Sequence, residues 1–216
     1  MKSVLISIQP KWCELIASGK KTVEVRKTKP KLETPFKVYI YCTQGDALAL
    51  PHLNNPHYAI HRMNNGTLNG RQMTAEEREQ SDHSFANGKV IGEFVCDTIH
   101  NIKIEEDFET GASSWECGYY AEEDCLSMEE FEAYLKKGFG YGWHISDLVI
   151  YKKPRELSEF KKPCICKGEY EGEEYCDCLN CDLAGDSDYG IIACDRKITR
   201  PPQSWCYVER REQNEG

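Results

Sequence analysis

The residues best suited to chemistry lie in the segment Gly19-Lys20-Lys21-Thr22-Val23-Glu24-Val25-Arg26, which has the form GxKxxExR. Alternate side chains of a strand share a face, so Glu24 and Arg26 are expected to be neighbours that pair or hold one ligand together. Arg26 can bind a phosphate or a base edge through two hydrogen bonds, and Glu24 can accept one from an amino group. Lys21 joins them only if it lies in the turn before the strand. The alternative interpretation is an ordinary charged surface strand.

Trp143 and His144, in the segment Gly-Trp-His-Ile, form a second candidate group for ligand binding. An indole ring can stack on a base, and an imidazole can donate a hydrogen bond to it. A tryptophan at the start of a strand is also typical of core packing, so both interpretations stay open for Trp143. The four histidines between residues 43 and 87 show no spacing that is typical of metal ligands.

Cysteine is unevenly distributed, because seven of the 12 cysteines fall between residues 164 and 206. Cys178 and Cys181 form a CxxC pair, a spacing that holds one tetrahedral Zn²⁺ from a tight turn. Free cysteines and disulfides are the alternatives, but without a secretory signal a metal explains the cluster better than disulfides. We therefore predict one structural zinc and no other cofactor. Its predicted ligands are Cys178, Cys181, Cys164 and Cys194, with Cys166 and Cys176 as substitutes.

The charge of the chain is also uneven. The 216 residues carry a net charge of −9, yet residues 1–40 hold nine basic and three acidic side chains. Such a locally basic face could hold a phosphate-bearing ligand, while the acidic remainder disfavours broad affinity for long nucleic acid. Solvated surface charge is the plainer explanation of both regions.

The elements that must position these residues are mostly short strands. Alternating or continuous apolar residues predict strands, Pro10 and the Ser127/Glu130 capping box predict helix starts, and Gly19 and Gly138 predict helix ends. Another capping box, at Thr74 and Glu77, predicts a short helix. The predicted strands are residues 4–8, 22–26, 36–42, 89–98, 144–151 and 205–209.

These elements predict an α+β fold, a small mixed β-barrel with covering helices and a Cys-rich C-terminal extension. The sequence contains no GxGxxG after a strand, no P-loop and no GxSxG, which argues against dehydrogenases, P-loop NTPases and α/β-hydrolases. No apolar run is long enough for a transmembrane helix or a signal peptide, so we expect a cytosolic protein that binds no membrane. The predicted divisions are a domain over 1–157 with a long excursion at 43–87, an acidic Cys-rich segment over 158–203, and a returning strand and tail over 204–216.

The GxKxxExR motif, Val90-Ile-Gly-Glu-Phe94 and Gly142-Trp-His-Ile-Ser146 together resemble the ASCH domain of the PUA-like superfamily. The resemblance covers about residues 1–157, and residues 198–209 resemble an extension of some members. It implies a PUA-like β-barrel whose cleft, lined by the motif, binds single-stranded RNA or a modified nucleoside. Some members are amidohydrolases that deacylate N4-acetylated cytidine, and ribonuclease activity is proposed for others.

The resemblance also implies candidate catalytic residues. Lys21 matches the lysine that the hydrolases use at the reaction centre, whereas Glu24 stands where those hydrolases carry threonine. They also use a carboxylate before a later helix; Asp124 is the nearest match, with Glu122 and Glu123 as rivals. Lys21, Glu24 and Asp124 are thus the catalytic candidates for an amidohydrolase or ribonuclease, and Lys21, Glu24, Arg26, Trp143 and His144 those for a binding module. A protein-interaction module acting through its Cys-rich segment is a third alternative, although nothing in the sequence identifies a protein partner.

Overall fold

The structure, a computed structural model of the chain, describes a core of strands with few helices. The described residues are 2–45, 47–52, 55–64, 67–68, 86–106, 113–117, 121–136, 138–163, 167–170, 173–176 and 196–209. The helices are α1 (Pro10–Ala17) and α3 (Met128–Tyr134), with short 3-10 helices η1 (Ala121–Glu123) and η2 (Leu157–Glu159). The strands are β1 (Lys2–Ile8), β2 (Val23–Arg26), β3 (Phe36–Cys42), β4 (Ala47–His52), β5 (Asn55–Asn64), β6 (Thr67–Leu68), β7 (Lys89–Cys96), β8 (Ile99–Glu106), β9 (Ser113–Cys117), β10 (Phe139–His144), β11 (Ser146–Arg155), β12 (Lys167–Tyr170), β13 (Glu173–Cys176) and β14 (Trp205–Glu209).

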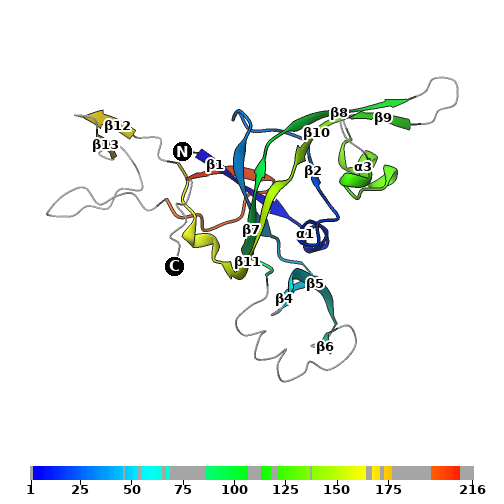
Figure 1. Cartoon of the computed structure of the whole chain (residues 1–216), viewed down its shortest axis with the longest axis horizontal. Coiled ribbons are helices and arrows are strands. Elements are labelled where there is room, and N and C mark those ends of the chain that lie inside the picture. Colours follow the sequence, from blue (N-terminus) through cyan, green and yellow to red (C-terminus); the bar gives the residue numbers. More distant parts are fainter. Residues whose placement is uncertain are drawn as a thin grey trace.

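Two sheets form the body of the molecule (Figure 1). The larger has the order β11-β7-β3-β1-β14, and the second has the order β2-β10-β8-β9. Within the larger sheet β1 runs parallel to β3 and antiparallel to β14, which brings the chain back to its first strand. The predicted return of residues 205–209 to the sheet is therefore confirmed. The remaining strands form two small sheets, β4-β5-β6 and β12-β13.

The two main sheets do not close into the predicted barrel. Among the described strands, the ladders end at β11 and β14 in one sheet and at β2 and β9 in the other. Side chains from the end of β1 and from β2 line a common cavity, and the Arg26 side chain, not a strand ladder, connects the two strands by donating to the Ser7 carbonyl. The α+β class is thus correct, but the sheets remain open where this cavity lies.

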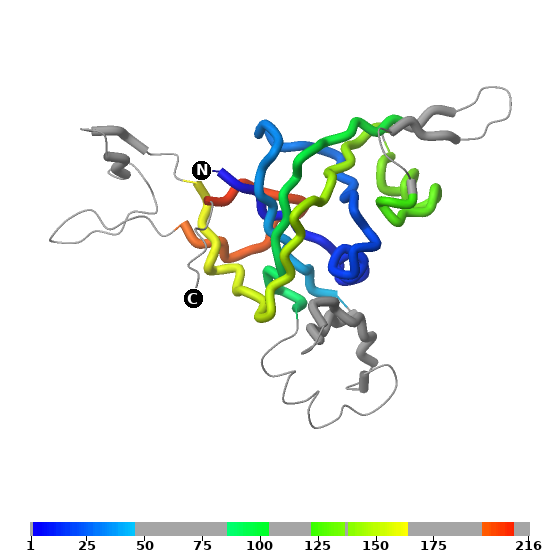
Figure 2. Tube along the Cα trace, in the orientation of Figure 1, coloured from blue at the N-terminus to red at the C-terminus, as the bar shows by residue number. Residues whose placement is uncertain are grey.

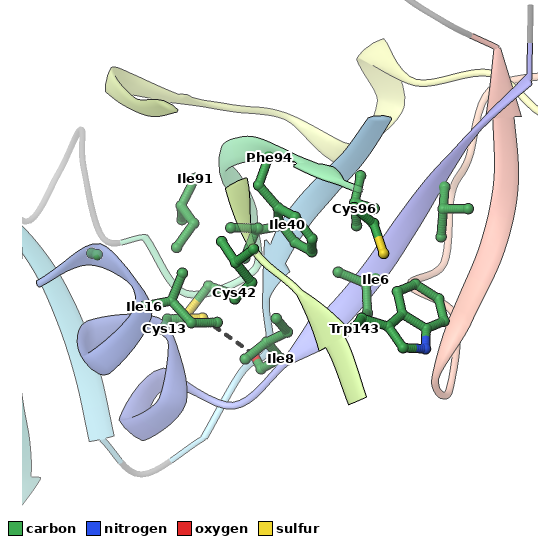
Figure 3. Packing of buried hydrophobic residues seen from close by; sticks show 14 of the residues in the cluster. Ile6, Ile8, Cys13, Ile16, Ile40, Cys42, Ile91, Phe94, Cys96 and Trp143 are labelled. Carbon is green, nitrogen blue, oxygen red and sulfur yellow. Dashed lines mark hydrogen bonds between the residues drawn. The ribbon is translucent and has the colours of Figure 1, made fainter. Parts of the chain in front are cut away.

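The main hydrophobic core lies between the sheets and is covered at one end by α1. Val4, Ile6 and Ile8 alternate along one face of β1 and pack on buried residues of neighbouring strands, with Cys13 and Ile16 of α1 closing the end (Figure 3). The opposite face of the larger sheet carries a second cluster of buried side chains, comprising Leu5, Tyr39, Tyr41, Val90, Phe160, Ile198 and Val208. Because both faces of the larger sheet are buried at β1, the sequence of this strand is almost continuously apolar.

Local sequence signals place the starts of both α-helices and the end of α1, whereas α3 ends at Tyr134, four residues before the predicted end at Gly138. Pro10 occupies the start of α1, and Gly19 has a φ of +72° just after the helix, the left-handed conformation that glycine adopts most readily. Ser127 and Glu130 form the expected capping box at the start of α3. No helix in the described part of the chain is both long and apolar enough to cross a membrane. The short helix expected at Thr74 lies outside the described residues.

The sequence pattern did not predict β8, β9 or most of β10, which together with β2 form the second main sheet. Strand β10 is the one that pairs with β2. Its glycines lower strand propensity, so only its last residue, His144, was included in a predicted strand. Gly140 is required by packing, because a side chain there would collide with Leu135 and would lie 3.0 Å from the Arg26 carbonyl oxygen. The same close approach lets β10 pair with β2 and hold the motif strand in place.

Three of the five cysteines that precede residue 164 are small core hydrophobes. Cys13, Cys42 and Cys96 are fully buried. Burial raises the pKa of the Cys13 thiol, and it raises that of Cys96 to about 12. The thiols of Cys13 and Cys96 therefore remain protonated and unreactive at neutral pH.

Candidate functional site

A cavity of about 800 Å³ opens where the two sheets separate. Its walls come from the end of β1, from α1, β2 and α3, and from the segment Pro201–Ser204 that leads into β14. Figure 1 shows α1, β2 and α3 gathered at one side of the molecule, and Figure 2 shows the orange-red C-terminal segment beside the blue first strand. A cavity of this size lies in the range of small-molecule sites. The lining residues are Ser7, Ile8, Gln9, Trp12, Lys21, Glu24, Val25, Arg26, Thr43, Leu126, Glu130, Ala133, Tyr134, Pro201, Pro202, Gln203 and Ser204.

Lys21 lies in the turn between α1 and β2, the position it needs to join the site. After Gly19 reverses the chain, the Lys21 amide donates to the carbonyl of Leu15, so the residue is still tied to the helix end. Its side chain is 2 % exposed and its Nζ donates to the backbone carbonyl of Asp124. The same Nζ lies 3.6 Å from Glu24 Oε2. The lysine is thus held by fixed partners at the cavity wall.

Glu24 and Arg26 follow on one face of β2 and pair with each other. Arg26 Nη2 lies 2.9 Å from Glu24 Oε1 and donates to the Ser7 carbonyl at 2.7 Å. Both residues are more than nine-tenths buried, so Arg26 is packed within the protein as well as lining the cavity. Glu24 Oε2 and Arg26 Nε make no hydrogen bond to any described residue. A buried polar atom without a hydrogen bond lowers the stability of the folded protein. Binding of a ligand that supplies the missing hydrogen bonds would therefore be favoured.

Asp124 is fully buried, but it meets Lys21 through its backbone and not through its carboxylate. The carboxylate oxygen Oδ1 accepts from the Leu126 amide at 2.8 Å, while the carbonyl accepts from Lys21. Asp124 is not among the described residues that line the cavity. Of its two rivals, Glu122 is exposed and Glu123 accepts the Thr22 amide through its carbonyl. The structure therefore brings together Lys21, Glu24 and Arg26, and the turn that holds Asp124 adds no second carboxylate to the cavity lining.

Trp143 and His144 lie away from the cavity. Trp143 is 0 % exposed and packs edge-on against Phe36 with ring centroids 5.8 Å apart, so the expected stacking on a base is wrong and the core-packing interpretation holds. His144 is partly exposed, and its Nδ1 lies 2.7 Å from Asp97 Oδ1. Burial raises the pKa of Asp97, but the hydrogen bond and charge of His144 outweigh it, so the pKa is lowered overall.

Several lining residues were not singled out from the sequence as site residues. Trp12, one of the apolar positions of α1, faces the cavity, and its ring lies 5.2 Å from Lys21 Nζ. Tyr134 of α3 is another, and burial raises the pKa of its phenol although Arg26 acts in the opposite direction. The segment Pro201–Ser204 had been assigned to the end of the Cys-rich segment and the start of a strand. No local pattern marks these residues, since only chain packing brings them together.

The predicted zinc ligands cannot be placed. Cys164, Cys178, Cys181 and Cys194, and the substitute Cys166, lie outside the described residues, and only the backbone of Cys176 is described. Within the described part of the chain, no group of three or more histidine, cysteine or acidic side chains is arranged to hold a metal ion. The zinc site therefore stays a prediction.

Comparison with known proteins identifies a relationship over most of the chain. The family model described as "ASCH domain" matches residues 6–178. Two similar solved structures are those of ASCH from Zymomonas mobilis and of a single-substitution mutant of it, each 19% identical with a TM-score of 0.42. The alignments cover 72% of this chain and 73% of the first, and 73% of this chain and 77% of the second. None of the curated proteins compared with the chain matches it.

Proposed function

The chain belongs to the ASCH domain family, which is PUA-like, and from this premise we propose that its cavity binds single-stranded RNA or a modified nucleoside. The observation that carries the proposal is the row of Lys21, Glu24 and Arg26, three buried charged side chains on the wall of one cavity of about 800 Å³. Burying a charge is costly unless it is paired and hydrogen-bonded. Glu24 Oε2, an acceptor, and Arg26 Nε, a donor, lack a hydrogen-bond partner among the described residues and could be satisfied by a ligand. A base presents the complementary groups along its edges.

The segment that follows β2 supports a phosphate-bearing ligand. Lys27, Lys29 and Lys31 are exposed, and none has a carboxylate within ion-pairing distance among the residues that the structure describes. Lys27 Nζ lies 4.8 Å from the ring centroid of Tyr134, which lines the cavity. Lysines interleaved with aromatic rings are typical of surfaces that bind single-stranded nucleic acid. These lysines would hold phosphates while the cavity receives a base.

The alternative function is hydrolysis at the same cavity. The protein would then be an amidohydrolase of N4-acetylcytidine-type nucleosides or a ribonuclease. The 3.6 Å separation of Lys21 Nζ and Glu24 Oε2 favours it, because an amine–carboxylate pair could activate water. The other contacts favour binding. Lys21 donates to a carbonyl, Glu24 is held by Arg26, and the Asp124 carboxylate is engaged by a backbone amide. Each charge thus has a protein partner that restrains it.

The experiment blocks the cavity without touching the charged row. Ala133 is exposed on α3 and lines the cavity, so Ala133→Trp places an indole ring in it. Calorimetric titration with cytidine 5′-monophosphate, N4-acetylcytidine and short single-stranded RNA should show binding to the wild type and a loss of at least about tenfold in the variant. Glu129→Trp, an exposed position of the same helix that does not line the cavity, is the matched control.

Two outcomes would contradict the proposal. The first is wild-type protein that binds none of the three probes, and the second is unchanged binding in Ala133→Trp. Product analysis of the same mixtures separates the alternative, because release of acetate from N4-acetylcytidine or shortening of the RNA would establish a hydrolase.

A further inference from the structure

The C-terminal segment supplies one whole wall of the cavity. Pro201, Pro202, Gln203 and Ser204 all line it, although about 175 or more residues of sequence separate them from strand β2, which lines it too. The two prolines restrict their own backbone torsions, so this wall has little freedom where it passes the cavity. A ligand in the cavity would therefore lie against a rigid segment. The residues of this segment can be substituted without changing the GxKxxExR motif.

Ser7 fixes this wall and the charged row at the same time. Its amide donates to the Ser204 carbonyl at 2.8 Å, and its hydroxyl donates to the Pro202 carbonyl at 2.6 Å. Its own carbonyl accepts from Arg26 Nη2 at 2.7 Å. Gln203 lies between Pro202 and Ser204, whose carbonyls both accept hydrogen bonds from Ser7. Because Ser7 also accepts a hydrogen bond from Arg26, these three bonds fix the backbone of Gln203 relative to Arg26.

Contacts beyond the cavity hold the same segment at both ends. Trp205 Nε1 donates to Thr28 Oγ1 at 3.0 Å, just after β2 ends. Upstream, the Ile198 amide donates to the Phe160 carbonyl at 2.8 Å, and Ile198 is buried. A segment anchored before and after residues 201–204 presents Gln203 at one place on the wall.

We propose that Gln203 is the residue that selects among bases, reading a Watson–Crick or Hoogsteen edge while Lys21, Glu24 and Arg26 provide general affinity. The inference rests on the proposed function. Of the residues 201–204, Gln203 is the one with an amide side chain. An amide offers two hydrogen-bond donors and an acceptor, and it is a group that pairs with base edges. Gln203 is exposed, so its amide is available to a ligand.

The test replaces the amide with an acceptor of the same shape. Gln203→Glu removes both donors, so it should disfavour a keto group, which needs a donor, relative to an amino group, which needs an acceptor. Cytidine and uridine 5′-monophosphates carry the same phosphate and differ in this way at position 4, the exocyclic group that Gln203 would contact. We therefore expect the ratio of the uridine to the cytidine dissociation constant to rise about tenfold in Gln203→Glu, while any repulsion of the phosphate cancels in the ratio.

Gln44→Glu is the matched control, since Gln44 is an exposed glutamine that follows the lining residue Thr43 but does not itself line the cavity. A ratio that shifts in Gln203→Glu and not in Gln44→Glu supports the inference. An unchanged ratio in Gln203→Glu, or an equal shift in both variants, overturns it while the proposed function stands. Wild-type protein that binds neither nucleotide overturns the proposed function, and the inference with it.

Discussion

Arg26 has two neighbours that depend on its charge. Its guanidinium pairs with Glu24 and donates to the Ser7 carbonyl, and all three residues are buried. Removing one member of a buried ion pair leaves the other charge without compensation, which is more damaging than removing both. The Arg26 side chain thus contributes to folding as well as to the cavity wall.

A double-mutant cycle at these two residues should reveal strong coupling. We expect Arg26→Met to lower the free energy of unfolding by up to about 3–5 kcal/mol, because the buried charge of Glu24 is then compensated by Lys21 alone, at 3.6 Å. Glu24→Gln in the Arg26→Met background should restore part of the loss. Urea unfolding of the four proteins measures the coupling. If the two losses simply add, the ion pair has no structural role and Arg26 serves the cavity alone.

Helix α3 forms one wall of the cavity, and its first turn is stabilised by Glu130. This residue closes the capping box with Ser127, and Lys11 of α1 lies 2.8 Å from its carboxylate. The hydrogen bond from Lys11, followed by that from the Ser127 amide, lowers the pKa of Glu130 below its ordinary value of 4.5. Ionised Glu130 therefore connects the two helices that flank the cavity.

The contribution of Glu130 to stability should depend on pH in a definite direction. Because its pKa is lower in the folded state, the stabilisation is fully present above pH 4.5 and is lost as the pH falls through the folded value. We expect Glu130→Gln to lower the melting temperature slightly at pH 7, with a difference from wild type that shrinks steadily in more acidic buffer. Glu129→Gln, at the neighbouring position of the same first turn, should show a smaller difference. Equal, pH-independent differences in both variants would contradict the assignment.

At the scale of the molecule, the acidic Cys-rich segment has few apolar residues to stabilise it. Thiolate coordination would supply that stability without an oxidising compartment, and four sulfur ligands would leave no open position for a substrate. We predict about one equivalent of zinc per chain in protein purified without chelator. Cys178→Ser should remove it, whereas Cys13→Ser, which alters a buried core thiol, should not. Less than about a tenth of an equivalent in the wild type would refute the prediction.

Much of the local structure followed from the sequence because neighbouring residues determine it. Apolar alternation predicted β3 and β14, and Pro10, Gly19 and the Ser127 capping box predicted where helices begin and end. Strand periodicity put Glu24 and Arg26 on one face, since side chains two apart in a strand point the same way. These predictions rest on contacts within a few residues, which the order of amino acids specifies directly.

Tertiary structure alone decided which residues meet at the cavity. The Ser7 hydroxyl reaches Pro202 across 195 positions of sequence, and Lys21 reaches the Asp124 carbonyl across 103. Trp143, read from its local pattern as a candidate for stacking, is instead enclosed because β10 pairs with β2 and lies against the core. Such long-range contacts depend on the packing of whole strands and helices, where the burial of apolar surface outweighs local preference, so no spacing along the chain could have disclosed them.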